Sequence, residues 1–386
     1  MGIEEVSVEA PLPAGKEADP KSTGRAVSVT EDDALPIPQL RQALDDLFVP
    51  NPVQYWLDFL ASMLCFYGGF AIVVLAPLAF PPKLGALAVS VLGLYRAGLF
   101  IHELAHFPPG RMPGFRMAWN LCCGFPLLMP DFLYESHVHH HRRTAYGTAD
   151  DGEYLPWGRP GGRPAILFFV TSSLLALPTG AVRFGILGPL SWLSPVLRRR
   201  VVTSASSLAV DMSYRRPLPT PAQDRRWRRH EAAVFVYLCA VLVGVLAGPV
   251  PAGWVLLLYL IASMAMLLNS FRTLAAHRYR SAGALMAMTE QLLDSVNYPR
   301  QAWLNELWAP VGLRFHALHH LFPGIPYHSL AAAHARLLRL LPAGSHYRRT
   351  EGRGLATSLR ALWRAARADR SATATLASGR RAGAAE

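Results

Sequence analysis

The chain is poor in cysteine, and its few cysteines lack the spacing of a metal or disulfide site. It contains Cys65, Cys122, Cys123 and Cys239, and no two of them form a C-x-x-C pair. The sequence therefore does not predict a cysteine-based zinc motif or a disulfide framework. Cys65 and Cys239 lie inside apolar runs, where we expect reduced cysteines that pack as small hydrophobic residues.

The sequence shows neither the pattern of a secretion signal nor a cofactor-binding motif. Residues 1–36 mix acids, lysine, glycine, serine and proline without hydrophobic periodicity, so we expect a disordered tail rather than a signal peptide with its apolar core. Neither a G-x-G-x-x-G dinucleotide motif nor a haem-binding cytochrome b5-type segment occurs. For any redox reaction we therefore expect a separate electron carrier.

Charged residues are scarce and their signs are unbalanced. Only 17% of the residues are charged, whereas 52% are hydrophobic, and 38 lysines and arginines outnumber 26 acids to give a net charge of +12. This balance is too apolar for an ordinary soluble protein. No nucleic-acid recognition motif accompanies the positive charge, so we expect it to face anionic membrane lipids or an acidic protein partner rather than nucleic acid.

Four apolar runs predict an all-α membrane protein with two helical hairpins. Each run is long enough to cross or nearly cross a hydrocarbon core of about 30 Å. Reversals are predicted at Pro81-Pro82-Lys83 and at Gly248-Pro-Val-Pro. The runs are residues 57–80, 84–101, 232–248 and 252–271.

The segments between and around these runs are less regular. We expect residues 37–56 to lie along the membrane surface, residues 107–136 to be re-entrant or interfacial, and residues 283–313 to form amphipathic helix. Residues 164–196 hold two short apolar pieces split at Pro178, and the sequence leaves open whether they are interfacial helices or a membrane hairpin. Residues 344–386 predict a basic C-terminal tail with a possible interfacial helix near Leu355–Leu362.

An arginine-rich loop predicts the orientation of the hairpins. Residues 197–230 carry nine arginines against two aspartates, which by the positive-inside rule places this loop in the cytoplasm. Both termini and the ends of the runs that lead into the histidine motifs then lie on the same side. We therefore expect a cytoplasmic helical cap above four transmembrane helices.

Most of the histidines lie in three short stretches of the sequence. These stretches are HELAH at 102–106, HVHHHRRT at 137–144 and RFHALHHLFPGIPYH at 314–328, and one further histidine follows the last apolar run. Residues three and four apart share a helix face, so each stretch presents two or three imidazoles together. The predicted metal ligands are His102, His106, His137, His140, His141, His277, His316, His319 and His320.

Nine imidazoles are more than one metal ion can use. A zinc ion takes about four ligands, so two ions with four or five nitrogens each would use the whole set. Imidazole suits iron, zinc, copper and nickel, and the ligand type leaves the metal open. A site beside an acyl layer suits dioxygen chemistry on hydrocarbon, which needs a redox metal.

The three stretches resemble the histidine boxes of the membrane fatty acid desaturase and hydroxylase superfamily. The phrases Tyr146-Gly-Thr, Glu153-Tyr-Leu-Pro and Arg272-Thr-Leu-Ala-Ala-His-Arg-Tyr look like its bacterial acyl-lipid desaturases. The likeness covers roughly residues 50–340 and implies a desaturase domain at 37–343. It also implies a di-iron centre, O2 as co-substrate, a ninth ligand at His277 and an external electron donor such as ferredoxin.

The resemblance implies a function and one departure from the family pattern. We expect an oxygen-dependent desaturase in the bacterial inner membrane that introduces a double bond into a fatty acyl chain, held as a lipid or an acyl thioester. In the animal acyl-CoA branch an asparagine that holds a metal-bound water stands four residues before the ninth histidine. Thr273 stands there in this chain, and its hydroxyl is the candidate water-holding group.

Two other functions remain open from the sequence. A lipid or carotenoid hydroxylase or ketolase of the same superfamily would use the same ligands. His102-Glu103-x-x-His106 also matches the zinc-protease motif, with Glu103 as general base, although we expect Glu103 to orient an imidazole instead. The other histidines are not predicted to be ligands. We expect His139 to be solvated or to lie on the substrate side, and His230 and His346 to lie at the surface. His328 is expected to support a ligand or to be structural, and His334 to be structural.

Overall fold

The computed structural model describes residues 35–367, and this part of the chain is helical. Its extended pairings are isolated bridges, and no strand forms among the described residues. This confirms the all-α class. The expected disordered tail at 1–36 and the last nineteen residues of the expected basic tail lie almost wholly outside the described residues.

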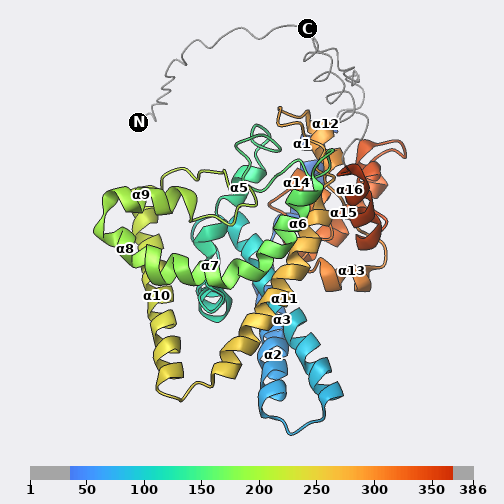
Figure 1. Cartoon of the computed structure of the whole chain (residues 1–386). Coiled ribbons are helices and arrows are strands. Elements are labelled where there is room, and N and C mark those ends of the chain that lie inside the picture. The colour runs from blue at the N-terminus through green and yellow to red at the C-terminus, as the bar shows by residue number, and fades with distance from the viewer. Residues whose placement is uncertain (1–34, 368–386) are drawn as a thin grey trace, which may run out of the picture. The chain divides into compact units, whose positions relative to one another are not determined.

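Helices form at all four expected apolar runs, with longer or shifted bounds. They are α2 (Pro52–Leu75), α3 (Phe80–His106), α10 (Pro221–Leu246) and α11 (Ala252–Ala276) (Figure 1). The structure contains a fifth segment that is long and apolar enough to cross a membrane, residues 163–193. The described chain therefore has five candidate spans, where the sequence predicted four.

The first reversal does not lie where the prolines predicted it. Pro81 and Pro82 form the first turn of α3, where a missing backbone N–H costs nothing, and the chain reverses at residues 76–79. At the other end α3 continues without a break through His106, as expected for two imidazoles that leave the bilayer on one helix face. The C-terminal half of α3 is buried, so both histidines point into the protein.

Two glycines let α2 and α3 approach closely. A Cβ atom on Gly69 would lie 2.5 Å from the backbone oxygen of Ala86, and one on Gly93 would lie 2.6 Å from the nitrogen of Phe66. The Ser90 hydroxyl donates a hydrogen bond of 2.8 Å to the Phe66 carbonyl at this crossing. Small residues of this kind bring membrane helices into backbone contact, and the tight crossing fixes the helix that carries the first histidine pair.

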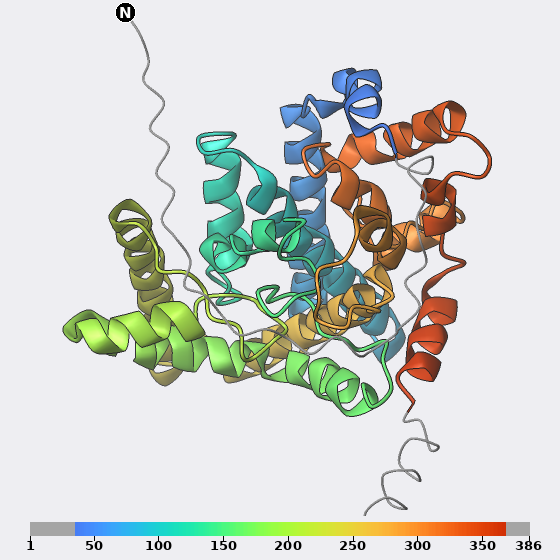
Figure 2. The ribbon, with the colours of Figure 1, turned by 90° about the horizontal axis from the view of Figure 1, so that it is seen from above.

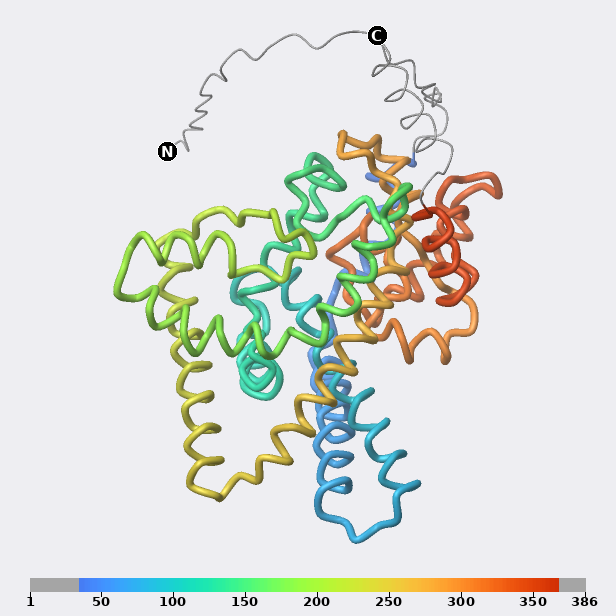
Figure 3. Tube along the Cα trace, viewed as in Figure 1, coloured from blue at the N-terminus to red at the C-terminus, as the bar shows by residue number. Residues whose placement is uncertain are grey.

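The second predicted hairpin is splayed. α10 and α11 diverge from the turn at residues 247–251 (Figure 3). α11 packs against α3, whereas α10 packs against η6 (Arg183–Leu187) and α8 (Gly188–Leu193). The two helices are consecutive in the chain but belong to different packing neighbourhoods.

The fifth candidate span bridges this gap. It comprises α6 (Arg163–Ser172), η5 (Ser173–Leu175), α7 (Ala176–Val182), η6 and α8. From above, this green segment reaches from the α11 side to α10 (Figure 2). The Tyr259 hydroxyl of α11 donates to the Leu174 carbonyl at 2.9 Å, and Arg183 is buried against Glu231 of α10 with their charged atoms 2.5 Å apart.

Several arginines of the 197–230 segment have structural partners. Arg198 lies in α9 (Pro195–Ser204), is buried and pairs with both Asp224 and Glu231, and Arg216 is buried beside Glu135. Arg226 and Arg228 also form ion pairs, so four of the nine arginines that predicted the orientation are paired within the fold. The positive surface charge of this segment is therefore smaller than the sequence alone indicated.

Short helices form the region that carries the remaining histidines. Residues 283–313, expected to be helical and amphipathic, are helical only in two short elements, with Pro299 between them and Pro310 after the second. The elements are α1 (Ile37–Ala43), η2 (Asp45–Phe48), α4 (Pro113–Trp119), η3 (Asn120–Gly124), η4 (Asp131–Tyr134), α5 (His137–His140), α12 (Met288–Asp294), α13 (Ala302–Trp308), α14 (His316–Leu321), η7 (Tyr327–Ser329), α15 (Leu330–Leu340), η8 (His346–Thr350) and α16 (Leu355–Ala365).

Asn297 fixes the third histidine stretch in this irregular region. Its side chain donates to the Thr350 hydroxyl at 3.0 Å and accepts from the backbone N–H of Leu318 at 3.1 Å. Its backbone N–H donates to the Thr350 carbonyl, and its carbonyl accepts from Gly352. A fully buried asparagine with these partners ties α14 to η8, so residues beyond 343 contribute directly to the position of the histidines.

The arrangement of the turns generates a prediction about orientation. The α2–α3 and α10–α11 turns lie at one end of the described structure, away from the short helices (Figure 1). We expect cysteines at Ala79 and Pro249, in a background without native cysteines, to react with an impermeant thiol reagent applied outside the cell. A cysteine at Ala222, at the start of α10, should react only after permeabilisation. Reaction of all three from outside would contradict the two-hairpin topology.

Candidate metal centre

Nine histidine side chains form two neighbouring groups at the C-terminal ends of α3 and α11. In each group, one nitrogen from every member lies within 4.8 Å of the others. All nine histidines expected from the sequence are present, and the other described histidines lie outside both groups. The first group is His102, His106, His137, His141 and His319, and the second is His140, His277, His316 and His320.

Helical spacing explains how the stretches divide between the groups. Side chains four residues apart on a helix stand one above the other, and each i, i+4 pair stays within one group: 102/106 and 137/141 in the first, 316/320 in the second. In the second and third stretches, the histidine three residues after the first one points toward the other group. His140 therefore joins the second group and His319 joins the first, so both stretches link the two centres.

The atoms that face one another are Nε2 nitrogens. Their separations are 2.9 Å for His277–His316, 3.3 Å for His140–His277, 3.1 Å for His316–His320, 2.9 Å for His137–His141, 3.0 Å for His106–His319 and 3.2 Å for His141–His319. Two nitrogens bound at about 2.1 Å to one ion, with about 90–110° between the bonds, lie about 3.0–3.4 Å apart. The two groups therefore have spacings that fit one metal ion each.

Unpaired ring nitrogens support the same fit. Both nitrogens of His102 are buried and have no hydrogen-bond partner among the described residues, and Nδ1 of His141, His316 and His319 is likewise unpartnered. A buried polar atom without a partner costs free energy. A cation bound to Nε2 of His102 would offset that cost.

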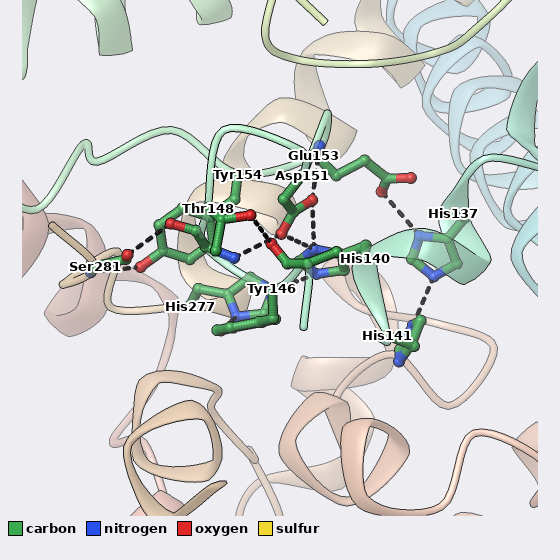
Figure 4. Close-up of polar contacts among 12 residues, drawn as sticks. His137, His140, His141, Tyr146, Thr148, Asp151, Glu153, Tyr154, His277 and Ser281 are labelled. Atoms are coloured by element: carbon green, nitrogen blue, oxygen red, sulfur yellow. Dashed lines mark hydrogen bonds and ion pairs between the residues drawn. The ribbon is translucent and has the colours of Figure 1, made fainter. Parts of the chain in front are cut away.

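Carboxylates and hydroxyls hold several rings from behind. Glu153 lies 2.8 Å from His137 Nδ1, and Asp151 lies 2.8 Å from His140 Nδ1 (Figure 4). The Tyr146 hydroxyl lies 2.8 Å from His277 Nδ1 and donates to Asp294 at 2.9 Å. An acceptor at Nδ1 keeps the proton there and directs the Nε2 lone pair toward the centre of the group, as in many histidine metal sites.

The sequence did not identify these partners. It drew attention to the phrases that contain Tyr146 and Glu153, but it gave no role to Asp151 or Asp294. Asp151 lies in a turn, where it also accepts from the backbone N–H groups of Gly147 and Glu153. A carboxylate that follows a histidine stretch within a tight turn is the signal that could have identified it.

Burial sets the protonation of most of the imidazoles outside the spans. Loss of solvation is the main cause that lowers the pKa of His141, His319 and His320 well below the usual value, and neighbouring imidazoles lower it further. Burial also acts to lower the pKa of His140, but Asp151 outweighs it and raises that pKa above the usual value. The neutral rings are in the form that binds a metal.

A largely apolar cavity of about 310 Å³ reaches both groups. It lies between α3 and α11, with α6, η5 and the loop at 207–210 completing its wall. His102 and His137 of the first group and His140, His277 and His316 of the second line it. An acyl chain that entered from the bilayer between these helices would reach both candidate metal positions.

The environment of Glu103 corrects the role expected for it. The carboxylate accepts hydrogen bonds from the Tyr55 hydroxyl and, at 3.2 Å, from the backbone N–H of Tyr327, so the expected contact with an imidazole is wrong. The same contacts argue against a protease base, because they occupy the carboxylate. Glu103 lines a separate cavity with His106 and is not part of the wall of the apolar cavity that reaches both groups. Three further histidines join His102 and His106, which is more than the zinc-protease motif supplies.

The other histidines have partners of their own. His139 lies outside both groups, with Nδ1 3.4 Å from the Tyr214 hydroxyl. His328 Nε2 accepts from the backbone N–H of Asn51 at 3.0 Å, and His334 Nδ1 lies 2.7 Å from the Tyr347 hydroxyl, so both are structural. His230 is not at the surface as expected: its side chain is 16% exposed and lies 3.2 Å from Asp131.

Comparison with known proteins agrees with the geometry. The fatty acid desaturase family matches residues 78–351, which include all nine histidines. The chain is also 42% identical over 339 residues to a ceramide hydroxylase of Caulobacter vibrioides, an alignment that covers 85% of this chain and 93% of that protein. The family match covers most of the chain, and the sequence identity to the relative is high over nearly its whole length. The chain belongs to the fatty acid desaturase family.

Proposed function

We propose that the protein uses dioxygen and a pair of iron ions to oxidise the hydrocarbon part of a membrane lipid. The observation that carries this proposal is the apolar cavity that opens onto both histidine groups. Five imidazoles would hold one ion and four the other, with His102 and His277 at the cavity wall. Iron supplies the redox capacity to activate dioxygen, and the protein positions one segment of the chain beside it.

Two outcomes are open to such a site, and both balance with the same supply of electrons. Hydroxylation replaces a C–H bond by C–OH, and the second oxygen atom leaves as water. Desaturation removes two hydrogens from adjacent carbons, and both oxygen atoms leave as water. Each outcome takes one dioxygen, two electrons and two protons. The family match supports desaturation and the ceramide hydroxylase relative supports hydroxylation, so ceramide-type lipids are the first substrates to test alongside fatty acyl lipids and acyl thioesters.

The electrons would come from a separate acidic carrier such as a ferredoxin. Arg142 and Arg143 directly follow His141 in the second histidine stretch and are exposed. They supply positive charge within a few residues of ligands in both groups. Complementary charge speeds the encounter of such partners. In this proposal the histidine groups face the cytoplasm at a bacterial inner membrane, and residues 37–343 form the catalytic domain.

Expression in a host without related enzymes tests the proposed function. Extracted lipids, with added ceramide, are compared by mass spectrometry with those from cells that carry the His316→Ala variant. Gain of one oxygen atom in a lipid shows hydroxylation, and loss of two hydrogens shows desaturation. Absence of both products from every lipid class, despite an iron-loaded and folded protein, would overturn the proposal.

The ligand set makes a sharper prediction. We expect His316→Ala to abolish oxidation and to lower bound iron, because it removes one of only four nitrogens from the second group. His139→Ala, which changes a histidine outside both groups, should keep both iron and activity. Iron per chain is measured by elemental analysis of purified protein. Two irons per chain and full activity in His316→Ala would contradict the assignment.

Thr273 remains a proposed water-holding residue. Its hydroxyl accepts from Arg272 Nη2 at 3.1 Å and lines the cavity, and a hydroxyl that accepts one bond can still donate another. We expect Thr273→Val to lower turnover per iron about two- to tenfold, the equivalent of one net hydrogen bond. Thr273→Ser keeps the hydroxyl and should lose less. Equal turnover in the Val variant and the wild type would leave Thr273 a packing residue.

A further inference from the structure

Arg272 is a buried cation for which the described chain provides no carboxylate. Its side chain is among the buried polar groups of α11, with the residue only 7% exposed. Its Nε and Nη2 groups donate to the Asn269 side-chain oxygen at 3.3 and 3.0 Å, and Nη2 also donates to Thr273. No ion pair joins it to any described acid, unlike the buried Arg183 and Arg198.

A guanidinium in such a place costs free energy unless oxygen acceptors surround it. Neutral amide and hydroxyl oxygens satisfy only part of its five N–H donors. Arg272 also lines the 310 Å³ cavity, and it is the only arginine or lysine among the residues of the cavity wall. The Arg272 side chain therefore borders the space that the proposed substrate would occupy.

The wall of the cavity changes from apolar to polar along α11. Ala262, Ala265 and Met266 line the part nearer the α10–α11 turn, and Asn269, Ser270, Arg272 and Thr273 follow toward the histidines. Arg272 precedes His277 by five residues, about 7.5 Å of helix rise. The polar part of the wall thus lies beside the second histidine group, and the apolar part lies away from it.

Arg272 lines the same cavity as His277 and His316 of the second group. A substrate oxygen bound to Arg272 inside this cavity would therefore share that space with the two rings.

We propose that Arg272, supported by Asn269 and Thr273, binds a carbonyl or carboxyl oxygen at the polar end of the lipid, so that oxidation occurs a few carbons from that oxygen. This deepens the proposed function and rests on it. A wholly apolar wall would suit a chain oxidised far from its head group. A guanidinium beside the histidines instead suits an N-acyl lipid such as ceramide, whose amide carbonyl is an oxygen acceptor, or a free fatty acid with its carboxylate.

Binding without turnover tests the recognition step. Purified iron-loaded protein, kept without an electron donor, is heated with ceramide, with free fatty acid or with an alkane of the same chain length. We expect the wild type to be stabilised more by one of the oxygen-bearing lipids than by the alkane, and Arg272→Gln to lose that difference. The loss should correspond to a weakening of lipid binding by about tenfold or more, as expected for one hydrogen bond to a charged group. Which lipid gives the difference identifies the oxygen as amide or carboxylate.

Arg300→Gln is the matched control. The Arg300 side chain is 82% exposed and lies outside the cavity wall. The Arg300→Gln variant therefore removes the same charge, but at the surface. It should keep the wild-type preference for oxygen-bearing lipids. Iron content should be unchanged in both variants, because neither residue is in a histidine group. An Arg272→Gln protein with the wild-type difference between ceramide, fatty acid and alkane would overturn the proposal.

The position of the product separates this inference from the proposed function. Fragmentation of the oxidised lipid locates the new hydroxyl or double bond, and we expect it near the amide or carboxyl carbon in the wild type. Arg272→Gln should spread the product over more carbons, an effect that a purely structural role would not produce. Oxidation in the middle or at the far end of the chain would overturn the inference and leave the proposed function intact, whether or not Arg272→Gln folds. No oxidation at all would overturn the proposed function.

Discussion

The close approach of nine mostly uncharged imidazoles is the constraint on which the rest of the structure depends. Their Nε2 atoms meet at about 3 Å in two groups, and His102 has no other partner for either nitrogen. Lone pairs that converge in this way repel one another unless a proton or a metal ion lies between them. The protein therefore holds the rings in place from outside each group, and its local structure is built for that purpose.

Three sets of contacts hold the rings: a helix crossing, a hydrogen-bonded link between two segments, and a turn. The glycine contacts at Gly69 and Gly93 fix α3, whose C-terminal end carries His102 and His106. Asn297 ties α14 to the segment after residue 343 through backbone and side-chain hydrogen bonds. Asp151 closes a turn with its backbone contacts while its carboxylate accepts from His140. A substitution at any of these residues would move histidine rings without changing a histidine.

The sequence predicted the parts of the site that depend on local spacing. The i, i+3 and i, i+4 relations within each stretch, and the position of His277 directly after α11, were enough to identify the nine histidines that the structure brings together. The sequence did not predict how the nine histidines divide into groups of five and four. That division depends on the relative rotation of α3, α5 and α14, which tertiary packing decides.

The same limit explains the errors in the fold. Hydropathy located the four apolar runs, because burial in lipid needs length and composition alone. It could not show that α10 packs away from α11, since that depends on the crossing segment at 163–193. Arginine counts indicated an orientation, but Arg198 and Arg216 are buried in ion pairs, a use of charge that only the folded structure reveals.

The distribution of charge around the site follows from these constraints. Asp151, Glu153 and Asp294 lie on the Nδ1 side of the rings, where they would partly neutralise bound metal ions and strengthen the ligands. The cavity side has one cation, Arg272, beside the second group. A positive charge there opposes metal binding in an apolar setting, so its presence has a cost. The carboxylates beside the rings would offset that cost, and one of them, Glu153, lines the same cavity as Arg272.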